Sequence, residues 1–327
     1  MIQHTLEKAE NILVITHIDP DGDAVGSLTA VGLAMKQIGQ KATLVCDDNV
    51  PERFRYLPMA DKARRGVNDS VHYDLLIAVD CGDEFRMGRA FAELSGPKPF
   101  IINIDHHITN TKFGDINLVD SKATSTTEIL YRLFGELDID ISEEIALCLL
   151  TGLITDTLGF RTTGVTANTL RTGADLVEAG ADLGFVTMQA LNLRAMSTME
   201  IWRTGMNKMR LDDGLLWASI TNQERKAVNF RSNSSVGLVN LLADVEEASM
   251  GAVLMEMNDS TVKVGLRCRP PYDVAEVASA LGGGGHPLAA GCTLVGTLEE
   301  AEAILVRACH EAIARQSRPI ASMEADV

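Results

Sequence analysis

The chain has 327 residues, of which 46% are hydrophobic and 23% are charged, which is typical of a globular protein large enough for two domains. Its formal net charge of −16 excludes a broad basic surface for long duplex nucleic acid, because phosphate contacts need clustered Lys and Arg. No apolar stretch approaches the roughly 20 residues that span a membrane. The start of the chain lacks signal-peptide features and the six cysteines form no C-x-x-C pair, so we expect a cytoplasmic protein with reduced cysteines and no membrane partner.

The first half of the chain alternates short apolar segments with helical patterns. The strand-like segments, rich in β-branched residues, are 11–16, 42–46, 74–79 and 100–104. The helical patterns fit 24–39, 125–137, 142–157 and 166–180. This alternation predicts an α/β fold, a doubly wound and mostly parallel sheet, in an N-terminal domain over residues 1–184.

The pattern changes after residue 184. A helical stretch over 185–209 has no neighbouring strand, so we interpret 185–221 as a helical linker followed by a connecting strand. Beyond it, strands are predicted at 215–220, 251–257 and 261–269, and helices at 233–243, 273–281 and 298–315. These elements predict a smaller α+β C-terminal domain over 222–315. Residues 316–327 show no pattern and are expected to be disordered.

Acidic and imidazole side chains follow three of the predicted strands. The strand predicted at 11–16 leads into His17, Asp19, Asp21 and Asp23. The strand at 74–79 leads into Asp80, and the strand at 100–104 leads into Asp105, His106 and His107. Asp156 is a fourth candidate, in a polar turn after an apolar helix. Because ligands bind outside the carboxyl ends of parallel strands, we expect these side chains to lie together.

Each cluster alone has a structural explanation, since Asp after a strand often caps a helix and Asp-Gly sequences form turns. Several carboxylates in one crevice, however, repel one another unless cations neutralise them. Carboxylates and imidazoles without thiolates suit Mn, with Mg, Fe or Co as substitutes. Asp21, Asp23, Asp80 and Asp156 carry four negative charges, which two divalent ions would balance. Such a pair of ions typically clamps a phosphoryl group and activates a water, so the pattern favours phosphoester hydrolysis.

The motifs HIDPDGDAVGS, VDCG, DHH and TGLITDT, in this order, resemble the four motifs of the DHH phosphoesterase superfamily. GGGGHPLAAG, at 282–291, resembles the glycine-rich motif of its associated C-terminal domain. The resemblance covers residues 10–315, and the length and layout are similar to the NrnA-like group. It implies a two-metal hydrolase, with Mn the best match, that acts on short oligoribonucleotides (a nanoRNase), on 3′-phosphoadenosine 5′-phosphate (pAp), or on both.

The resemblance also implies roles for individual residues. The first ion would be held by His17, Asp21 and Asp80. The second would be held by Asp23, Asp80, His106 and Asp156, so that Asp80 bridges the two ions. The catalytic set would be His107 facing the substrate phosphate, Asp80, and Asp105 orienting the site. Asp19 is interpreted as a supporting residue and not as a ligand.

Substrate contacts are expected mainly in the C-terminal domain. The GGGGH run offers successive backbone N–H groups that could cradle phosphate, although a glycine run alone could equally be a flexible loop. Arg267 and Arg269 lie two apart on a predicted strand and so share a face, where a guanidinium group can bind phosphate through two hydrogen bonds. The predicted substrate-binding residues are Arg267, Arg269, His286, Gly283, Gly284, Gly285 and Arg161. Arg161 could also be an ordinary surface residue, and helix capping is enough to explain segment 123–130.

Two other functions stay open from the sequence. One is a phosphodiesterase acting on cyclic or linear dinucleotides such as c-di-AMP, pApA or pGpG. The other is a non-catalytic nucleotide sensor, which would be expected to lack one of the metal ligands. A pyrophosphatase is disfavoured, because the chain has no basic motif similar to SRKKQ. The expected partner is a short RNA or a small nucleotide phosphate, and a homodimer is left open.

Overall fold

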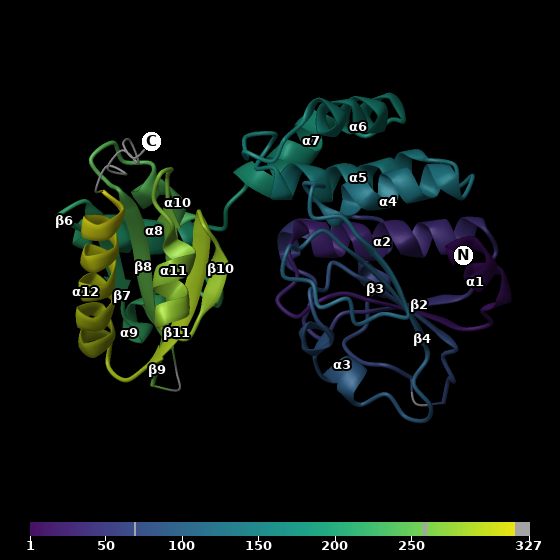
Figure 1. The fold of residues 1–327 in the computed structure, drawn as a ribbon, viewed down its shortest axis with the longest axis horizontal. Helices are drawn as coiled ribbons and strands as arrows, with labels where there is room; N and C mark the ends of the chain where they lie inside the picture. Colours follow the sequence, from purple (N-terminus) through teal and green to yellow (C-terminus); the bar gives the residue numbers. More distant parts are fainter. Residues whose placement is uncertain (69, 258–259, 318–327) are drawn as a thin grey trace, which may run out of the picture. The chain divides into compact units, whose positions relative to one another are not determined.

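The computed structural model describes residues 1–68, 70–257 and 260–317 (Figure 1). The chain divides into two compact units, Met1–Leu193 and Arg194–Val327. This boundary falls inside the segment 185–221 that was expected to link the domains. Among the described residues, no helix combines the length and the apolar character needed to cross a membrane.

The first unit contains a sheet of five parallel strands. Their order is β2-β1-β3-β4-β5, with bounds β1 (Ile12–Ile15), β2 (Ala42–Val45), β3 (Leu75–Val79), β4 (Phe100–Asp105) and β5 (Ile116–Val119). Because β1 pairs with both β2 and β3, the strand order reverses there, and ligands bind at such switch points. The sequence analysis missed β5, a short and only partly buried edge strand.

Helices cover both faces of this sheet. Their bounds are α1 (Ile2–Lys8), α2 (Gly22–Gln37), α3 (Gly88–Ala92), α4 (Thr126–Glu136), α5 (Glu143–Asp156), α6 (Ala167–Glu178) and α7 (Leu183–Thr187). Ile12 and Val14 of β1 pack into a core with α2, α4 and α5, whereas Leu13 and Ile15 pack on the opposite face with residues of α3. The predicted doubly wound α/β fold is therefore confirmed.

Helices α2 and α5 approach each other closely through glycine. Residues 22–35 of α2 are all buried, so this helix needs a partner on almost every side. A Cβ atom at position 26 would lie 2.6 Å from the carbonyl oxygen of Cys148 on α5, so Gly26 allows the two backbones to meet. Asp21 caps α2, and the helix therefore begins two residues before its predicted start.

We expect Gly26→Ala to lower the free energy of unfolding by about 1–3 kcal/mol, because the added methyl group must push the two helices apart. Gly135→Ala is the matched control, since no atom lies within 4 Å of a Cβ atom there, and it should leave stability unchanged or raise it by up to ~1 kcal/mol. Urea unfolding followed by circular dichroism measures both changes. Equal stability of the two variants would contradict this view of the α2–α5 contact.

The second unit contains a mixed sheet of six strands. Their order is β10-β11-β9-β8-β7-β6, with bounds β6 (Arg210–Asp212), β7 (Leu215–Ile220), β8 (Met250–Glu256), β9 (Thr261–Cys268), β10 (Gly284–His286) and β11 (Ala289–Val295). Only β7 and β8 pair in parallel. The helices are α8 (Met196–Lys208), α9 (Asn222–Ala227), α10 (Leu238–Ala243), α11 (Val274–Ala280) and α12 (Leu298–Gln316). The smaller α+β domain that the sequence predicts is present, but the sequence pattern missed β6, β10, β11 and α9, and the helix predicted over 233–243 begins only at Leu238.

The helix predicted over 185–209 is interrupted. After α7 comes a π-helical turn (Met188–Asn192), and the backbone is then extended at Leu193 and Ala195 before α8 begins. Neither proline nor glycine marks this break, so the sequence pattern did not reveal it. Ile201 of α8 packs with β7, which places both elements in the second unit. Residues 318–327 of the predicted tail lie outside the described residues.

Candidate metal centre

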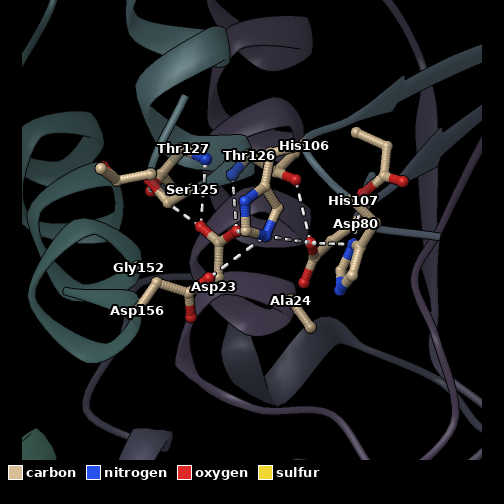
Figure 2. Close-up of polar contacts among 12 residues, drawn as sticks. Asp23, Ala24, Asp80, His106, His107, Ser125, Thr126, Thr127, Gly152 and Asp156 are labelled. Carbon is tan, nitrogen blue, oxygen red and sulfur yellow. Dashed lines mark hydrogen bonds and ion pairs between the residues drawn. The ribbon is translucent and has the colours of Figure 1, made fainter. Parts of the chain in front are cut away.

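The side chains predicted to bind metal meet at the carboxyl ends of β1, β3 and β4 (Figure 2). The segment after β1 carries His17 and leads into the N-terminus of α2, while Asp80 directly follows β3. Asp156 is the last residue of α5, and the close packing of α5 on α2 places it near the same point. Three groups have ligand atoms within 4.8 Å of one another: His17, Asp21 and Asp80; Asp23, His106 and Asp156; and Asp80, His106 and His107.

His17 presents one ring nitrogen to the carboxylates. Its Nδ1 donates to the carbonyl oxygen of Ile18 at 2.7 Å, which leaves Nε2 facing Asp80 at 3.4 Å and Asp21 at 4.0 Å. Burial alone lowers the pKa of His17, but the hydrogen bond and charge of Asp80 outweigh burial and raise the pKa to about 9. Without a metal ion, the imidazole therefore carries a proton at neutral pH.

His106 lies among three carboxylates. Its Nε2 is 3.2 Å from Asp156, 3.7 Å from Asp80 and 4.0 Å from Asp23. Burial lowers the pKa of His106, but the hydrogen bond and charge of Asp156, with the two other carboxylates, raise it to about 11. The pKa of Asp156 is raised to about 6 by burial, although His106 opposes the shift. The imidazoles thus neutralise carboxylates that a cation could otherwise neutralise.

Asp23 is fully buried and is held by the N-terminus of α4. The backbone N–H groups of Thr126 and Thr127 donate to it at 2.6 Å and 3.0 Å, and the Thr127 hydroxyl donates at 2.8 Å (Figure 2). These donors stabilise a carboxylate there. Burial still raises the pKa of Asp23 well above its usual range, and the charges of Asp80 and Asp156 add to the rise. Gly152 lies against the same part of Asp23, because a Cβ atom there would overlap both Oδ1 of Asp23 and the Thr127 side chain.

Asp80 occupies a strained position at the end of β3. Its φ of 60° lies in the left-handed region, which Asp tolerates better than most residues. The hydroxyl of Thr126 donates to Oδ1 at 2.9 Å. Burial would raise the pKa of Asp80, but the hydrogen bond and charge of His17 outweigh burial and hold it well below its usual range. Asp80 belongs to two of the three ligand groups, as a bridging carboxylate would.

His107 is oriented by a buried hydrogen-bond network. Its Nδ1 donates at 2.7 Å to Asp105, which is fully buried and also accepts from the Asn110 side chain at 2.6 Å. Asn110 donates in addition to the Cys81 carbonyl oxygen. Burial lowers the pKa of His107, but the hydrogen bond to Asp105 and the neighbouring carboxylates raise it overall.

The three predicted arginines lie in different environments. Arg161 is exposed, and its Nε donates to the carbonyl oxygen of Leu158 at 2.7 Å. Arg267, on β9, is half-buried, and burial lowers its pKa. The Arg269 Nη2 donates to three backbone carbonyl oxygens in the segment after α10, those of residues 245, 246 and 248. This nitrogen of Arg269 therefore holds the chain in place.

The glycine-rich segment is an edge strand. Residues Gly284–His286 form β10, which pairs with β11. A Cβ atom at Gly285, whose φ is 144°, would lie 2.6 Å from the Ala289 carbonyl oxygen, and one at Gly283 would overlap the Gly291 carbonyl oxygen. Close approach to β11 thus explains these two glycines. As the outermost strand in the sheet order, β10 leaves one backbone edge without a strand partner, and such an edge can donate N–H groups to a ligand.

The sequence analysis missed the residues that support the centre. Thr126 and Thr127 were interpreted as part of a helix cap, yet they bind Asp23 and Asp80 as well. Asn110, which holds Asp105, lies in a loop without a recognisable pattern. Only the Ser-Thr-Thr sequence at the start of α4 could have indicated these supporting residues, because a helix N-terminus attracts carboxylates.

A doubly wound α/β unit with carboxylates and imidazoles gathered at its switch point is the arrangement of a metal-dependent hydrolase. Residues 11–153 match the DHH family, N-terminal domain, and residues 217–314 match the DHHA1 domain. The chain therefore belongs to the DHH family of phosphoesterases, in its NrnA-like group, as the motifs predicted. Enzymes of this family are metal-dependent hydrolases of phosphoester bonds.

Individual proteins that resemble this chain are consistent with its membership of the DHH family. The chain is 32% identical to the bifunctional oligoribonuclease and PAP phosphatase NrnA of Thermus thermophilus, over 96% of this chain and 94% of that protein. It is 29% identical to a probable manganese-dependent inorganic pyrophosphatase of Streptococcus mutans, over 53% of this chain and 56% of that one. An exopolyphosphatase-related protein from Bacteroides fragilis has the same fold, with a TM-score of 0.89 at 22% identity, over 97% of this chain and 96% of that one.

We expect metal binding to release about two protons at pH 7, because His17 and His106 are protonated in the metal-free protein and a ligand imidazole must be neutral. Affinity should accordingly rise with pH, more steeply below about 9, the pKa of His17, than between about 9 and about 11, the pKa of His106. Calorimetric titration of Mn²⁺ in buffers of different ionisation enthalpy counts the protons. His106→Gln should reduce the count by about one, whereas His4→Gln, in an exposed position, should not change it. Proton-free binding would contradict this assignment.

Proposed function

We propose that the chain hydrolyses short oligoribonucleotides and pAp with two divalent ions, Mn being the best match. The observation that carries the proposal is a set of three ligand groups, in which Asp80 belongs to two groups and His106 also belongs to two. The first ion would be held by His17, Asp21 and Asp80, and the second by Asp23, Asp80, His106 and Asp156. All six positions carry a ligand, which argues against a non-catalytic sensor.

The donor atoms fit such ions. Oxygen and imidazole nitrogen suit Mn, and the groups contain no thiolate. One similar protein is named as a manganese-dependent pyrophosphatase, which supports the choice of Mn. Bound ions would polarise the phosphoryl oxygens and lower the pKa of the attacking water.

The chain's own residues supply orientation and a proton. Asp105 accepts from Nδ1 of His107 and so keeps the ring in one orientation. The raised pKa of His107 increases its protonated fraction at neutral pH, so its Nε2 can donate to a phosphate oxygen or to the leaving oxygen. Thr126 and Thr127 hold two of the carboxylates in place while substrate binds.

The substrate class follows from the relatives and from charge. The Thermus relative is named an oligoribonuclease and PAP phosphatase, and both activities hydrolyse phosphate esters of short nucleotides. A net charge of −16 disfavours long strands, because affinity must then come from a few local groups. We propose the backbone of Gly283–Gly285 and the side chains of His286, Arg267, Arg269 and Arg161 as those groups. Each of the three arginines also donates to a backbone carbonyl oxygen.

Asp80→Asn should reduce hydrolysis of pAp by about 10³-fold or more, because loss of the bridging carboxylate removes several kcal/mol of transition-state stabilisation. Asp19→Asn is the matched control, since Asp19 lies exposed in the same acidic loop, outside the ligand groups, and Asn tolerates its φ of 52°. Phosphate release in Mn²⁺ measures both. Retained turnover in Asp80→Asn, with circular dichroism showing an unchanged fold, would contradict the two-ion assignment.

Chain length should determine the rate on RNA. Purified protein in Mn²⁺ should degrade a 5-mer RNA at least about tenfold faster than a 24-mer, because the acidic surface offers few phosphate contacts to a long strand. Parallel reactions with pAp, pApA and pGpG rank the small substrates. Comparable rates on the 5-mer and the 24-mer would count against a short-substrate enzyme, and a preference for pApA or pGpG over every RNA would favour a dinucleotide phosphodiesterase.

A further inference from the structure

A second charged site lies in the second unit, outside the metal centre and outside the segment of Arg267 and His286. It is a cavity of about 410 Å³ next to α9 and the segment that follows it. We call it the cationic cavity, and its polar lining consists mainly of Arg225, Lys226, Arg231, Asn229 and Asn233. The end of β8 closes one side through Met257.

The charge of the cationic cavity is unbalanced. Of the residues that the structure describes, three cations and no carboxylate line it, although the whole chain carries a net charge of −16. Within the part of the chain that the structure describes, neither Lys226 nor Arg231 forms an ion pair with a carboxylate. Cations that remain together in an acidic protein mark a site for an anion.

In two other cavities, one lining cation pairs with a carboxylate of the same lining. The cavity between α4 and α6 contains Arg132 bound to Asp120 at 2.7 Å. The cavity beside β6 contains Arg210 bound to Glu302 at 2.7 Å. The carboxylate of Glu256 accepts from the backbone N–H of the lining residue Asn222, but Glu256 is not itself part of the lining.

The guanidinium group of Arg225, which lines the cavity, is held in place by backbone carbonyl groups. Its side chain is only 5% exposed. Nη1 donates to the Glu256 carbonyl oxygen at 2.8 Å, and Nη2 donates to the Ser232 carbonyl oxygen at 2.9 Å. The Nε–H group is buried and has no acceptor among the described residues. A buried guanidinium charge without a carboxylate partner and with one unused donor lacks an anionic acceptor.

We propose that the cationic cavity binds the phosphate group of a small nucleotide. A phosphate monoester carries up to two negative charges and three terminal oxygens, which can pair with Lys226 and Arg231 beside the fixed charge of Arg225. The volume lies within the range of sites for small molecules. The side-chain amides of Asn229 and Asn233 can donate to and accept from a ribose or a base. The site is independent of hydrolysis, because none of its residues belongs to the metal centre.

The test uses the whole chain, free of metal, in EDTA, so that no hydrolysis takes place. Inorganic phosphate, AMP and adenosine are titrated in turn, and two-dimensional ¹H–¹⁵N NMR follows the Nε–H signal of Arg225, assigned with Arg225→Lys. Phosphate and AMP should shift this signal, with AMP binding at least about fivefold tighter, and adenosine should leave it unmoved. Lys226→Gln combined with Arg231→Gln, both in exposed positions, should weaken AMP binding at this signal at least about tenfold.

Arg307→Gln, which removes an exposed cation of α12 outside the cavity, is the matched control and should change nothing. An Arg225 signal that stays unmoved at saturating AMP would overturn the proposal. So would equal AMP affinity in the double variant and the wild type, or a shift of equal size with adenosine. Equal affinity for inorganic phosphate and AMP would overturn the assignment of a nucleotide.

Discussion

Two buried carboxylates, Asp23 and Asp80, lie in one crevice, and the structure of the first unit compensates for their like charges. Like charges repel strongly in such surroundings, so each carboxylate needs donors, a counter-charge, or both. The N-terminus of α4 supplies backbone and hydroxyl donors through Thr126 and Thr127. In the absence of metal, protonated imidazoles supply the counter-charge, and divalent ions can replace those protons.

The packing of α5 on α2 determines the position of Asp156 in the same centre. Asp156 reaches His106 because α5 lies close against α2, and glycines permit that approach. A side chain at Gly152 would overlap Asp23, so this glycine serves both the packing of the helices and the space around a candidate ligand. Stability and the geometry of the candidate centre are therefore coupled at this interface, since a larger residue that separates the helices also moves Asp156 away from His106.

Three arginines of the second unit lie in different surroundings. Arg269 uses a terminal nitrogen to hold backbone carbonyl groups, and Arg210 pairs with Glu302. Arg225 is held by carbonyl groups as well, yet its charge has no carboxylate partner among the described residues and faces a cavity with other cations. Residue type alone does not separate these roles, because each depends on which acceptors the fold places within reach.

The sequence by itself predicted the first-unit sheet strands except β5, the three strands β7, β8 and β9 of the second unit, and the candidate ligands, because apolar runs and the spacing of His and Asp are local properties. It could not reveal the break at Leu193 or the left-handed Asp80, since neither glycine nor proline marks them. The glycine run 283–285 was ambiguous until pairing with β11 showed an edge strand. Only the tertiary structure decided that Thr126 and Asn110 support the centre, because their partners lie elsewhere in the chain and meet them only after the sheet and helices pack.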